Sequence, residues 1–250
     1  MSEFKIAGLA TIKEREQALK MTVDSIIDQV DVLMIYFNDY EDTPGWLKSY
    51  SMKGKIHRFG SIERPPFQEA YLKQIDIGDK GKFFTIKFCN GYYFSLDDDL
   101  IYPPDYIDRM IKAIEIFDRE AIITNHGRVI PDREIRSYYR DTRAPYHFNN
   151  RVQGFHPVHI GGTGVMGFHT DTFRPDLSKM PRKNMADLYI ADQAQDKGIP
   201  IIVQPHSSDW IKQNSYIDQR KSIFARNRTN DFHQTQLIKR RTSWQLKDIL

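Results

Sequence analysis

The sequence contains a single cysteine and no long apolar run. Cys89 has no partner for an internal disulfide, and no cysteine cluster has the spacing of a metal site. This usage is typical of a reducing compartment. No apolar stretch approaches the ~20 residues of a membrane-spanning helix, and residues 1–4 do not begin a basic and then apolar signal segment. These absences argue against a secreted or membrane-spanning protein, and we expect a cytoplasmic one.

Net charge is low, and it is unevenly distributed. The chain of 250 residues carries a net charge of +3. Residues 212–250 hold nine Lys/Arg and three Asp, a balance of +6, which leaves −3 for the remainder. We expect 212–250 to be a basic tail or helical extension that contacts an anionic partner, such as phosphates, an acidic polymer or the inner face of an anionic membrane. The alternative is a solvated helix end without a partner.

Short apolar runs alternate with helical patterns along the chain. Residues 5–10 and 32–37 have the composition of strands, and apolar residues recur at helical spacing from 19 to 30. Thr11, followed three residues later by Glu14, predicts a capping box at the start of that helix. The further expected elements are strands at 56–59, 92–96, 121–124 and 199–204, a polar loop or helix start at 75–82, an apolar run at 83–87, a helix over 107–117 capped by Asp105, and a helix ending at Gly198.

This alternation predicts an α/β fold in which helices flank a mainly parallel sheet. A composition with 40% hydrophobic and 28% charged residues suits one globular domain. We place that single domain at residues 1–211. Residues 128–157 are basic and rich in tyrosine but lack clear periodicity, so we expect an insertion or a lid there.

Three adjacent carboxylates, Asp97, Asp98 and Asp99, directly follow the apolar run YYFSL. Like charges at such short range repel one another, and a bound cation would relieve that repulsion. Alternate strand residues share a face, so Asp97 and Asp99 are the natural pair of ligands. Hard divalent ions such as Mn²⁺ or Mg²⁺ take oxygen ligands and bridge carboxylates to phosphates. A solvent-exposed acidic turn is the alternative.

Several segments, in this order, resemble the family-2-type glycosyltransferases of the GT-A fold. They are KIAGLATIKERE, VLMIYFND, GYYFSLDDDLIYPPDYI, GGTGVMGF and ADLYIADQAQDKGIPIIV, and they span roughly the first 210 residues. The resemblance implies a Rossmann-like nucleotide-binding half at 1–100 and an acceptor half at 101–211. It also implies a divalent metal on the diphosphate of a nucleotide-sugar donor and inversion at the transferred sugar. The Gln-x-x-Arg-Trp element of processive synthases is missing.

The resemblance assigns donor-side roles residue by residue. The acidic triplet matches the DxD element, in which Asp97 and Asp98 touch the donor and Asp97 and Asp99 hold the metal, with Asp99 the foremost ligand. His206 follows the last strand, where many GT-A enzymes place a metal-coordinating histidine, although a lone histidine is often structural. Residues that match nucleotide-contacting or sugar-contacting positions are Thr11, Asn38, Asp39, Lys82, Gly162 and Thr163. A solvated lysine and a glycine packing turn are the alternatives at Lys82 and 162–164.

On the acceptor side, Asp187 matches the general base of inverting members, although the first acid of the family's pair is replaced by Ala186. Asp192 is the competing base, and a helix N-terminal acid that stabilises the helix dipole is the alternative role for Asp187. Six residues of the unassigned middle section are candidates for the acceptor pocket or a cover over the donor: His126, Arg128, Tyr138, Tyr139, His147 and His156.

We therefore predict an inverting, metal-dependent glycosyltransferase. Its donor would be a UDP-sugar, and its acceptor a glycan of a surface polysaccharide; nothing in the sequence points to nucleic acid. Two other classes stay open at this stage. One is a nucleotidyltransferase or other phosphoryl-transfer enzyme that uses the same acidic cluster, and the other is a non-catalytic module that binds an anionic ligand through the basic tail.

Overall fold

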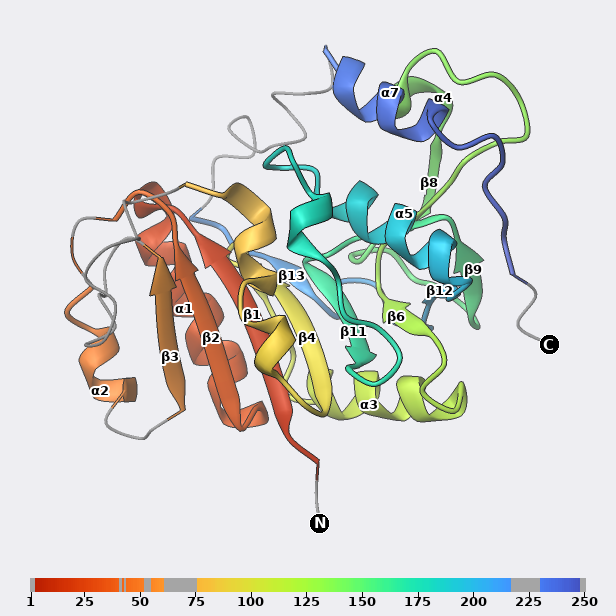
Figure 1. Ribbon diagram of the computed structural model, residues 1–250. Coiled ribbons are helices and arrows are strands. Elements are labelled where there is room, and N and C mark those ends of the chain that lie inside the picture. Colours follow the sequence, from red (N-terminus) through yellow and green to blue (C-terminus); the bar gives the residue numbers. More distant parts are fainter. Residues whose placement is uncertain are drawn as a thin grey trace.

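An eight-stranded sheet forms the centre of the molecule, with helices on both faces (Figure 1). The structure is a computed structural model that describes residues 3–40, 42, 44–51, 55–60, 76–216 and 230–247. The strands run in the spatial order β3-β2-β1-β4-β11-β6-β12-β9. Their bounds along the chain are β1 (Lys5–Thr11), β2 (Val32–Phe37), β3 (Ile56–Gly60), β4 (Tyr92–Asp97), β6 (Ile122–Thr124), β9 (His156–Val158), β11 (Val165–His169) and β12 (Ile201–Val203).

The sheet is mixed but mainly parallel. Strands β3, β2, β1 and β4 are parallel neighbours, as are β6 and β12, whereas β11 and β9 run antiparallel to their partners. The α-helices are α1 (Glu16–Ile26), α2 (Leu47–Ser51), α3 (Tyr106–Ile116), α4 (Tyr138–Asp141), α5 (Ala186–Lys197) and α7 (Phe232–Lys239). The 3₁₀ helices are η1 (Lys13–Arg15), η2 (Ile27–Gln29), η3 (Gly78–Phe83), η4 (Ile86–Phe88) and η5 (Leu177–Lys179). The predicted α/β fold, a mainly parallel sheet flanked by helices in one domain, is confirmed.

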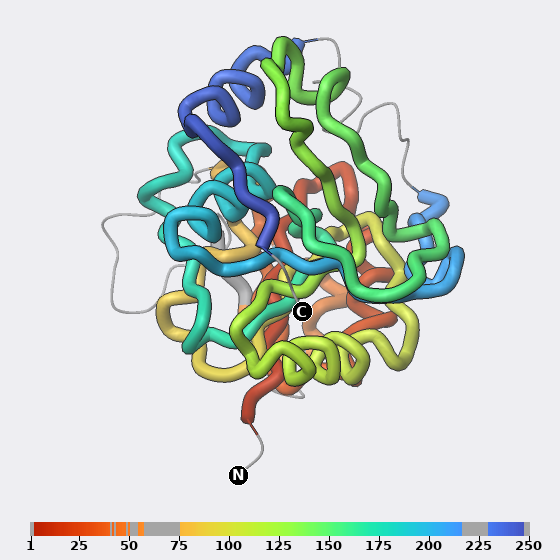
Figure 2. Tube along the Cα trace, turned by 90° about the vertical axis from the view of Figure 1, so that its right-hand side faces the viewer, coloured from red at the N-terminus to blue at the C-terminus, as the bar shows by residue number. Residues whose placement is uncertain are grey.

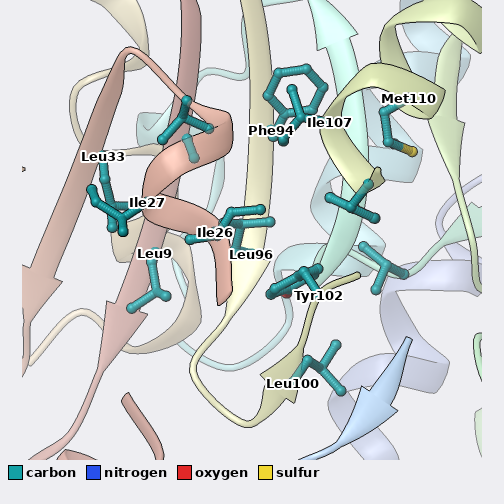
Figure 3. Packing of buried hydrophobic residues seen from close by; sticks show 14 of the residues in the cluster. Leu9, Ile26, Ile27, Leu33, Phe94, Leu96, Leu100, Tyr102, Ile107 and Met110 are labelled. Atoms are coloured by element: carbon teal, nitrogen blue, oxygen red, sulfur yellow. The ribbon is translucent and has the colours of Figure 1, made fainter. Parts of the chain in front are cut away.

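Alternating side chains divide the core into two layers. On β1, Leu9 joins the cluster formed with α1 and α3, whereas Ile6 joins the cluster formed with η3 and α5. On β4, Phe94 and Tyr93 divide in the same way, because successive strand residues point to opposite faces. Figure 3 shows the first layer, in which Leu9, Phe94 and Leu96 pack against Ile26 and Ile107. Both faces of the central strands are therefore buried, as expected for a parallel sheet.

Two predicted helix caps do not form. Thr11 is the last residue of β1, and the chain stays extended at Ile12 before η1 begins without a side-chain cap. The backbone N–H of Lys13 instead donates to the Asp39 carboxylate at 3.2 Å. Asp105 precedes α3 without capping it, because its carboxylate accepts a hydrogen bond from the Trp210 indole at 3.0 Å. In both places a distant partner replaces the local hydrogen bond that the sequence predicts.

The two segments without clear periodicity adopt short elements. The polar stretch at 75–82 continues as η3 from Gly78, while Ile75 itself lies outside the described residues; the apolar run at 83–87 covers the end of η3 and the start of η4. The segment at 128–157 supplies α4, part of β9 and most of a small antiparallel sheet. That sheet has the order β10 (Ile160–Gly161), β7 (Gly127–Val129) and β8 (Arg143–Tyr146).

The described part of the predicted basic tail packs on the main body. Residues Lys212–Gln213 form β13, which pairs with β5 (Leu100–Ile101), and α7 contacts α4 and α5. In Figure 2 the blue C-terminal segment lies beside the cyan chain that contains α5. Residues 217–229 and 248–250 lie outside the described residues, so the anionic partner stays a prediction. Of the helices within the described ranges, none is long and apolar enough to cross a membrane.

Candidate functional site

The predicted site residues come together at one edge of the sheet. Thr11, Asn38 and Asp97 stand at the carboxyl ends of β1, β2 and β4, which are parallel neighbours. The loop at 162–164 reaches the same edge because it enters β11, which runs antiparallel to β4. Ligands of open α/β sheets bind at this edge. The topology therefore gathers residues that are up to about 150 positions apart in the sequence.

Lys82 is buried and forms an ion pair with the Asp97 carboxylate. Only 3% of its side chain is exposed, and the backbone oxygen of Lys82 accepts a hydrogen bond from the Tyr93 hydroxyl. Burial acts to lower the pKa of Lys82, but the carboxylates of Asp97 and Asp79 outweigh burial and raise it. The lysine is therefore a charged group inside the site, and the solvated-loop alternative is wrong.

Gly8 on β1 lets η3 approach closely enough to place Lys82. A Cβ atom on Gly8 would lie 2.0 Å from the Lys82 backbone oxygen and 2.1 Å from the Tyr93 hydroxyl oxygen. Both atoms belong to a packed core, so Gly8→Ala is expected to lower the free energy of unfolding by about 3 kcal/mol, as measured by urea unfolding. Gly45→Ala is the control, because a Cβ there meets nothing within 4 Å. Equal stability of the two variants would contradict the close packing.

Arg15 neutralises the other two carboxylates of the acidic triplet. Its guanidinium lies 2.6 Å from Asp98 Oδ1 and 3.3 Å from Asp99 Oδ2. Burial raises the pKa of Asp98, and burial together with the charges of Asp97 and Asp98 raises the pKa of Asp99 to about 7. The repulsion within the triplet is thus relieved by Arg15 and Lys82, two cations that belong to the chain itself. The sequence predicts only a bound metal ion in this role.

The carboxylates still suit a divalent cation that has few protein ligands. The Asp97 side chain is 41% exposed, and Asp99 contacts Arg15 through Oδ2. Among the described residues there is no group of three or more His, Cys, Asp and Glu that could hold a metal. Mg²⁺ is commonly held by one or two carboxylates together with substrate phosphates and water. Asp97 and Asp99 fit that kind of site.

The structure gives His206 other contacts. The residue is 3% exposed, and its Nδ1 lies 2.8 Å from the Gln204 backbone oxygen. Its Nε2 lies 3.3 Å from the His147 backbone oxygen, and its own backbone bridges to Val152. Both ring nitrogens thus face protein carbonyl groups. These contacts favour the structural role for His206, and its metal-ligand role stays a prediction that would need them to break.

Asp187 lies in the first turn of α5 and faces the glycine-rich loop. Its Oδ1 accepts hydrogen bonds from the Thr163 backbone N–H at 2.8 Å and from the Thr163 hydroxyl at 2.5 Å. Within the part of the chain that the structure describes, no hydrogen bond engages its Oδ2. Burial raises the pKa of Asp187, whereas Thr163 and the charge of Lys82 partly lower it. The carboxylate is therefore held in place by one oxygen while the other stays available for a proton.

The competing base, Asp192, is occupied elsewhere. Its carboxylate forms an ion pair with Arg241 at 2.7 Å, and its backbone oxygen accepts from the same guanidinium at 2.9 Å. Arg241 also pairs with Asp196. This arrangement ties α5 to the segment after α7, so it favours Asp187 over Asp192 as the base candidate.

Tyr102 joins the acidic triplet to the glycine-rich loop. Its hydroxyl accepts the backbone N–H of Asp97 at 2.9 Å and donates to the Gly164 backbone oxygen at 2.6 Å. A Cβ on Gly164 would lie 1.9 Å from Asp97 Oδ2, so only glycine permits this approach. Gly162 packs in a similar way against His126. The glycines at 162 and 164 therefore have a packing role next to the acidic triplet, and contact of this loop with the sugar stays a prediction.

Asn38 and Asp39, the two predicted nucleotide contacts after β2, differ in their exposure to solvent. Asn38 is buried, and its side-chain amide bonds to backbone groups of Thr11, Ile77 and Gly78. Its role in this structure is to hold the loop before η3, and direct contact with a base stays a prediction. Asp39 is exposed, adopts a left-handed backbone with φ 51°, and accepts from the Lys13 backbone N–H. Contact of Asp39 with a nucleotide stays a prediction.

Aromatic and basic side chains of the middle section pack against one another, and their contact with an acceptor or donor stays a prediction. The guanidinium carbon of Arg128 lies 5.1 Å from the ring centre of Tyr138 and 5.4 Å from that of Tyr139. The rings of His126 and His147 are 4.7 Å apart, and burial with the neighbouring His147 lowers the pKa of His126 to about 3. His126 is therefore a neutral ring near the site. His156 stacks on Tyr146 instead and bonds to the Gln153 backbone.

Three residues of the site were not predicted from the sequence: Arg15, Asp79 and Tyr102. The adjacent basic and acidic residues in KERE were the available signal for Arg15, since an acidic triplet requires counter-charges. Tyr102 lies three residues after Asp99, but its role depends on the position of Gly164. The Asp79 carboxylate accepts a hydrogen bond from the first residue of α5, more than 100 residues away. No local sequence pattern indicates that contact.

Comparisons with known proteins give structural neighbours and no sequence relatives. No family model matches the chain, and no curated protein matches it. Residues 1–349 of S. aureus TarS in complex with UDP-GlcNAc align with 83% of this chain and 57% of that one, at 9% identity and a TM-score of 0.49. A second structure, of S. aureus TarS, aligns with 83% of this chain and 36% of that one, at 11% identity and a TM-score of 0.46. The 4-diphosphocytidyl-2C-methyl-D-erythritol synthase of Anaerococcus prevotii aligns with 90% of this chain and 95% of that one. The identity is 12% and the TM-score is 0.42. The chain thus spans less than two thirds of the TarS structures, and at such identities and scores these similarities carry no functional argument.

Proposed function

We propose that this chain transfers a sugar, with inversion, from a nucleotide-diphosphate sugar to a glycan hydroxyl. One observation carries the proposal: the Asp97–Lys82 ion pair and the Asp187–Thr163 hydrogen bonds lie at the same edge of the sheet. The charge of Lys82 acts on both carboxylates, Asp97 and Asp187. Such a site holds both charge for a leaving diphosphate and a base for an attacking hydroxyl. The donor is proposed to be a UDP-sugar, and the acceptor a glycan of a surface polysaccharide.

Positive charge on the donor side would stabilise the departing diphosphate. Lys82 is desolvated, so its interaction with a developing phosphate charge is stronger than it would be in water. A divalent ion, Mn²⁺ or Mg²⁺, when bound by Asp97 and Asp99, would supply further positive charge to stabilise the departing diphosphate. Arg15 holds Asp98 and Asp99 in position. Asp39 is proposed to contact the nucleotide.

On the acceptor side, Asp187 would accept the proton of the attacking hydroxyl. Its Oδ1 is held by two hydrogen bonds from Thr163, which orient Oδ2 for that proton. The raised pKa increases the basicity of the carboxylate, provided that it is deprotonated at the working pH. The hydroxyl oxygen then bonds to the anomeric carbon as the bond from that carbon to the diphosphate oxygen breaks. Attack from the face opposite the leaving group inverts the configuration.

A thermal-shift panel tests this function with UDP, other nucleotides and UDP-sugars, each with and without Mn²⁺. Saturation at about 100 times the dissociation constant stabilises a protein by roughly 2.7 kcal/mol, which corresponds to about 5–10 °C for a chain of this size. We expect UDP with Mn²⁺ to reach that range. The absence of any metal-dependent stabilisation by a nucleotide would contradict the proposal.

The reaction product separates the remaining function classes. Transfer of a sugar releases UDP, whereas a nucleotidyltransferase releases pyrophosphate from a nucleoside triphosphate. A non-catalytic anion-binding module would release neither, would bind in a strongly salt-dependent manner, and would be indifferent to Asp99→Ala. Detection of UDP with a UDP-sugar and a glycan acceptor therefore supports the proposal against both alternatives.

A further inference from the structure

The first turn of α5, which carries Asp187, has no cap from its own segment. Met185 occupies the N-cap position and makes no side-chain capping hydrogen bond. The first backbone N–H groups of a helix have no partner within the helix. A helix whose opening turn must hold a base in a defined position therefore needs those groups satisfied from another part of the fold.

Asp79, from a segment more than 100 residues earlier, supplies that cap. Its Oδ2 accepts the Ala186 backbone N–H at 2.9 Å, and its Oδ1 accepts the Asn184 backbone N–H at 2.8 Å. In the other direction, the Asp79 backbone N–H donates to Asn184 Oδ1 at 3.4 Å. The carboxylate also places negative charge at the helix N-terminus, where the helix dipole favours it. This is a capping arrangement made between two distant segments.

Backbone conformation on both sides is adapted to this contact. Gly78 has φ 68°, and a Cβ there would lie 2.6 Å from both Asn184 Oδ1 and Lys183 Cβ. Asn184 has φ 62°, a left-handed conformation that asparagine tolerates better than most residues. The two segments thus approach as closely as they do because position 78 has no side chain.

Asp79 and Lys82 belong to the same 3₁₀ turn, η3. That turn is packed on β1 at Gly8, and Lys82 pairs with Asp97 at the end of β4. In Figure 1 it is the orange-yellow coil in front of β1, on the side that faces the start of α5. One short turn therefore touches the donor side through Lys82 and the acceptor side through Asp79.

We propose that Asp79 is a positioning residue that sets the first turn of α5, and with it Asp187, relative to the Lys82–Asp97 pair. The catalytic consequence rests on the proposed function, whereas the structural link does not. Asp79 itself is not proposed to touch the substrate. It determines where the base stands with respect to the departing diphosphate.

The test compares Asp79→Asn with the wild-type protein. An asparagine has the same size but only one acceptor oxygen, so the backbone N–H of either Asn184 or Ala186 loses its partner. We expect kcat to fall about 10- to 100-fold, because a displacement of the base near 1 Å has a cost of that order. The KM for the donor should stay within about threefold, since Lys82 keeps its ion pair with Asp97. Amide hydrogen exchange at residues 184–188 should accelerate.

Asp76→Asn is the matched control. Asp76 lies three residues earlier, accepts a backbone N–H from Gly78 at 2.9 Å and pairs with Lys183, which precedes Asn184. It makes no described contact with α5 itself. We expect kcat within about twofold of wild type and unchanged exchange at residues 184–188, because a partly exposed ion pair contributes little. Should Asp79→Asn not fold, Asp79→Glu, which keeps the charge but displaces it by one methylene, is measured in the same way.

The outcomes separate the two proposals. Unchanged exchange at residues 184–188, or a kcat equal to that of Asp76→Asn, would overturn the role of Asp79. If the wild-type protein transfers no sugar from any nucleotide sugar, the proposed function fails. In that case faster exchange at 184–188 in Asp79→Asn alone would still support the structural link, and its absence would overturn the link as well.

Discussion

Replacing Asp187 with asparagine is expected to lower kcat for sugar transfer about 10²–10⁴-fold, the usual contribution of a positioned general base. The amide oxygen can still accept from Thr163, so the loop and α5 should stay in contact. Donor affinity should therefore be nearly unchanged. Steady-state kinetics of UDP release, together with the thermal shift produced by UDP, measure the two quantities separately.

The pH dependence provides a second measurement of the same residue. Burial raises the pKa of Asp187 above its ordinary value, and the base must be deprotonated to work. The rate should consequently fall as the pH drops through that raised pKa. The contribution of Asp187 to this acidic limb should be absent in Asp187→Asn, whereas Asp99, whose pKa is raised to about 7, still titrates in the variant. Asp192→Asn is the control, because Asp192 pairs with Arg241. Wild-type activity in Asp187→Asn, together with loss of activity in Asp192→Asn, would move the base to position 192.

Replacing Lys82 with methionine is expected to lower kcat about 10²–10³-fold, the size found when one preorganised charge-stabilising group is removed. Methionine keeps the length of the side chain but removes the buried ammonium that pairs with Asp97. The free energy of unfolding should also fall, by roughly 3 kcal/mol, because removal of one partner of a buried ion pair leaves the other charge uncompensated. The carboxylates of Asp97, Asp79 and Asp187 all lose this cation. Initial rates and urea unfolding of the same preparation separate the two effects.

Lys80→Met is the matched control for this experiment. Lys80 belongs to the same 3₁₀ turn, but its ammonium donates to the Met180 backbone oxygen, not to a carboxylate of the site. We expect its kcat to stay within about twofold of the wild-type value. A Lys82→Met enzyme that keeps the wild-type rate would show that the leaving group is stabilised without this lysine.

Elements with strong local periodicity could be predicted from the amino-acid sequence alone. The strands at 5–10, 32–37 and 92–96 and the helix that ends at Gly198 were all predicted within a few residues, because alternation and helical spacing are properties of a short window. The acidic triplet could also be placed at a strand end. Since parallel strands end at the same edge of a sheet, the edge that holds the candidate site followed from the order of the elements.

Tertiary structure decided how the charges of the site are balanced. The sequence could not show that Arg15 pairs with Asp98 and Asp99, or that Lys82 is buried and not solvated. Nor could it show that Asp79 caps a helix more than 100 residues away. These contacts join segments whose separation along the chain carries no periodic signal. They depend on how closely two backbones approach, as at Gly8 and Gly78, and that distance exists only once the sheet and its covering turns are packed.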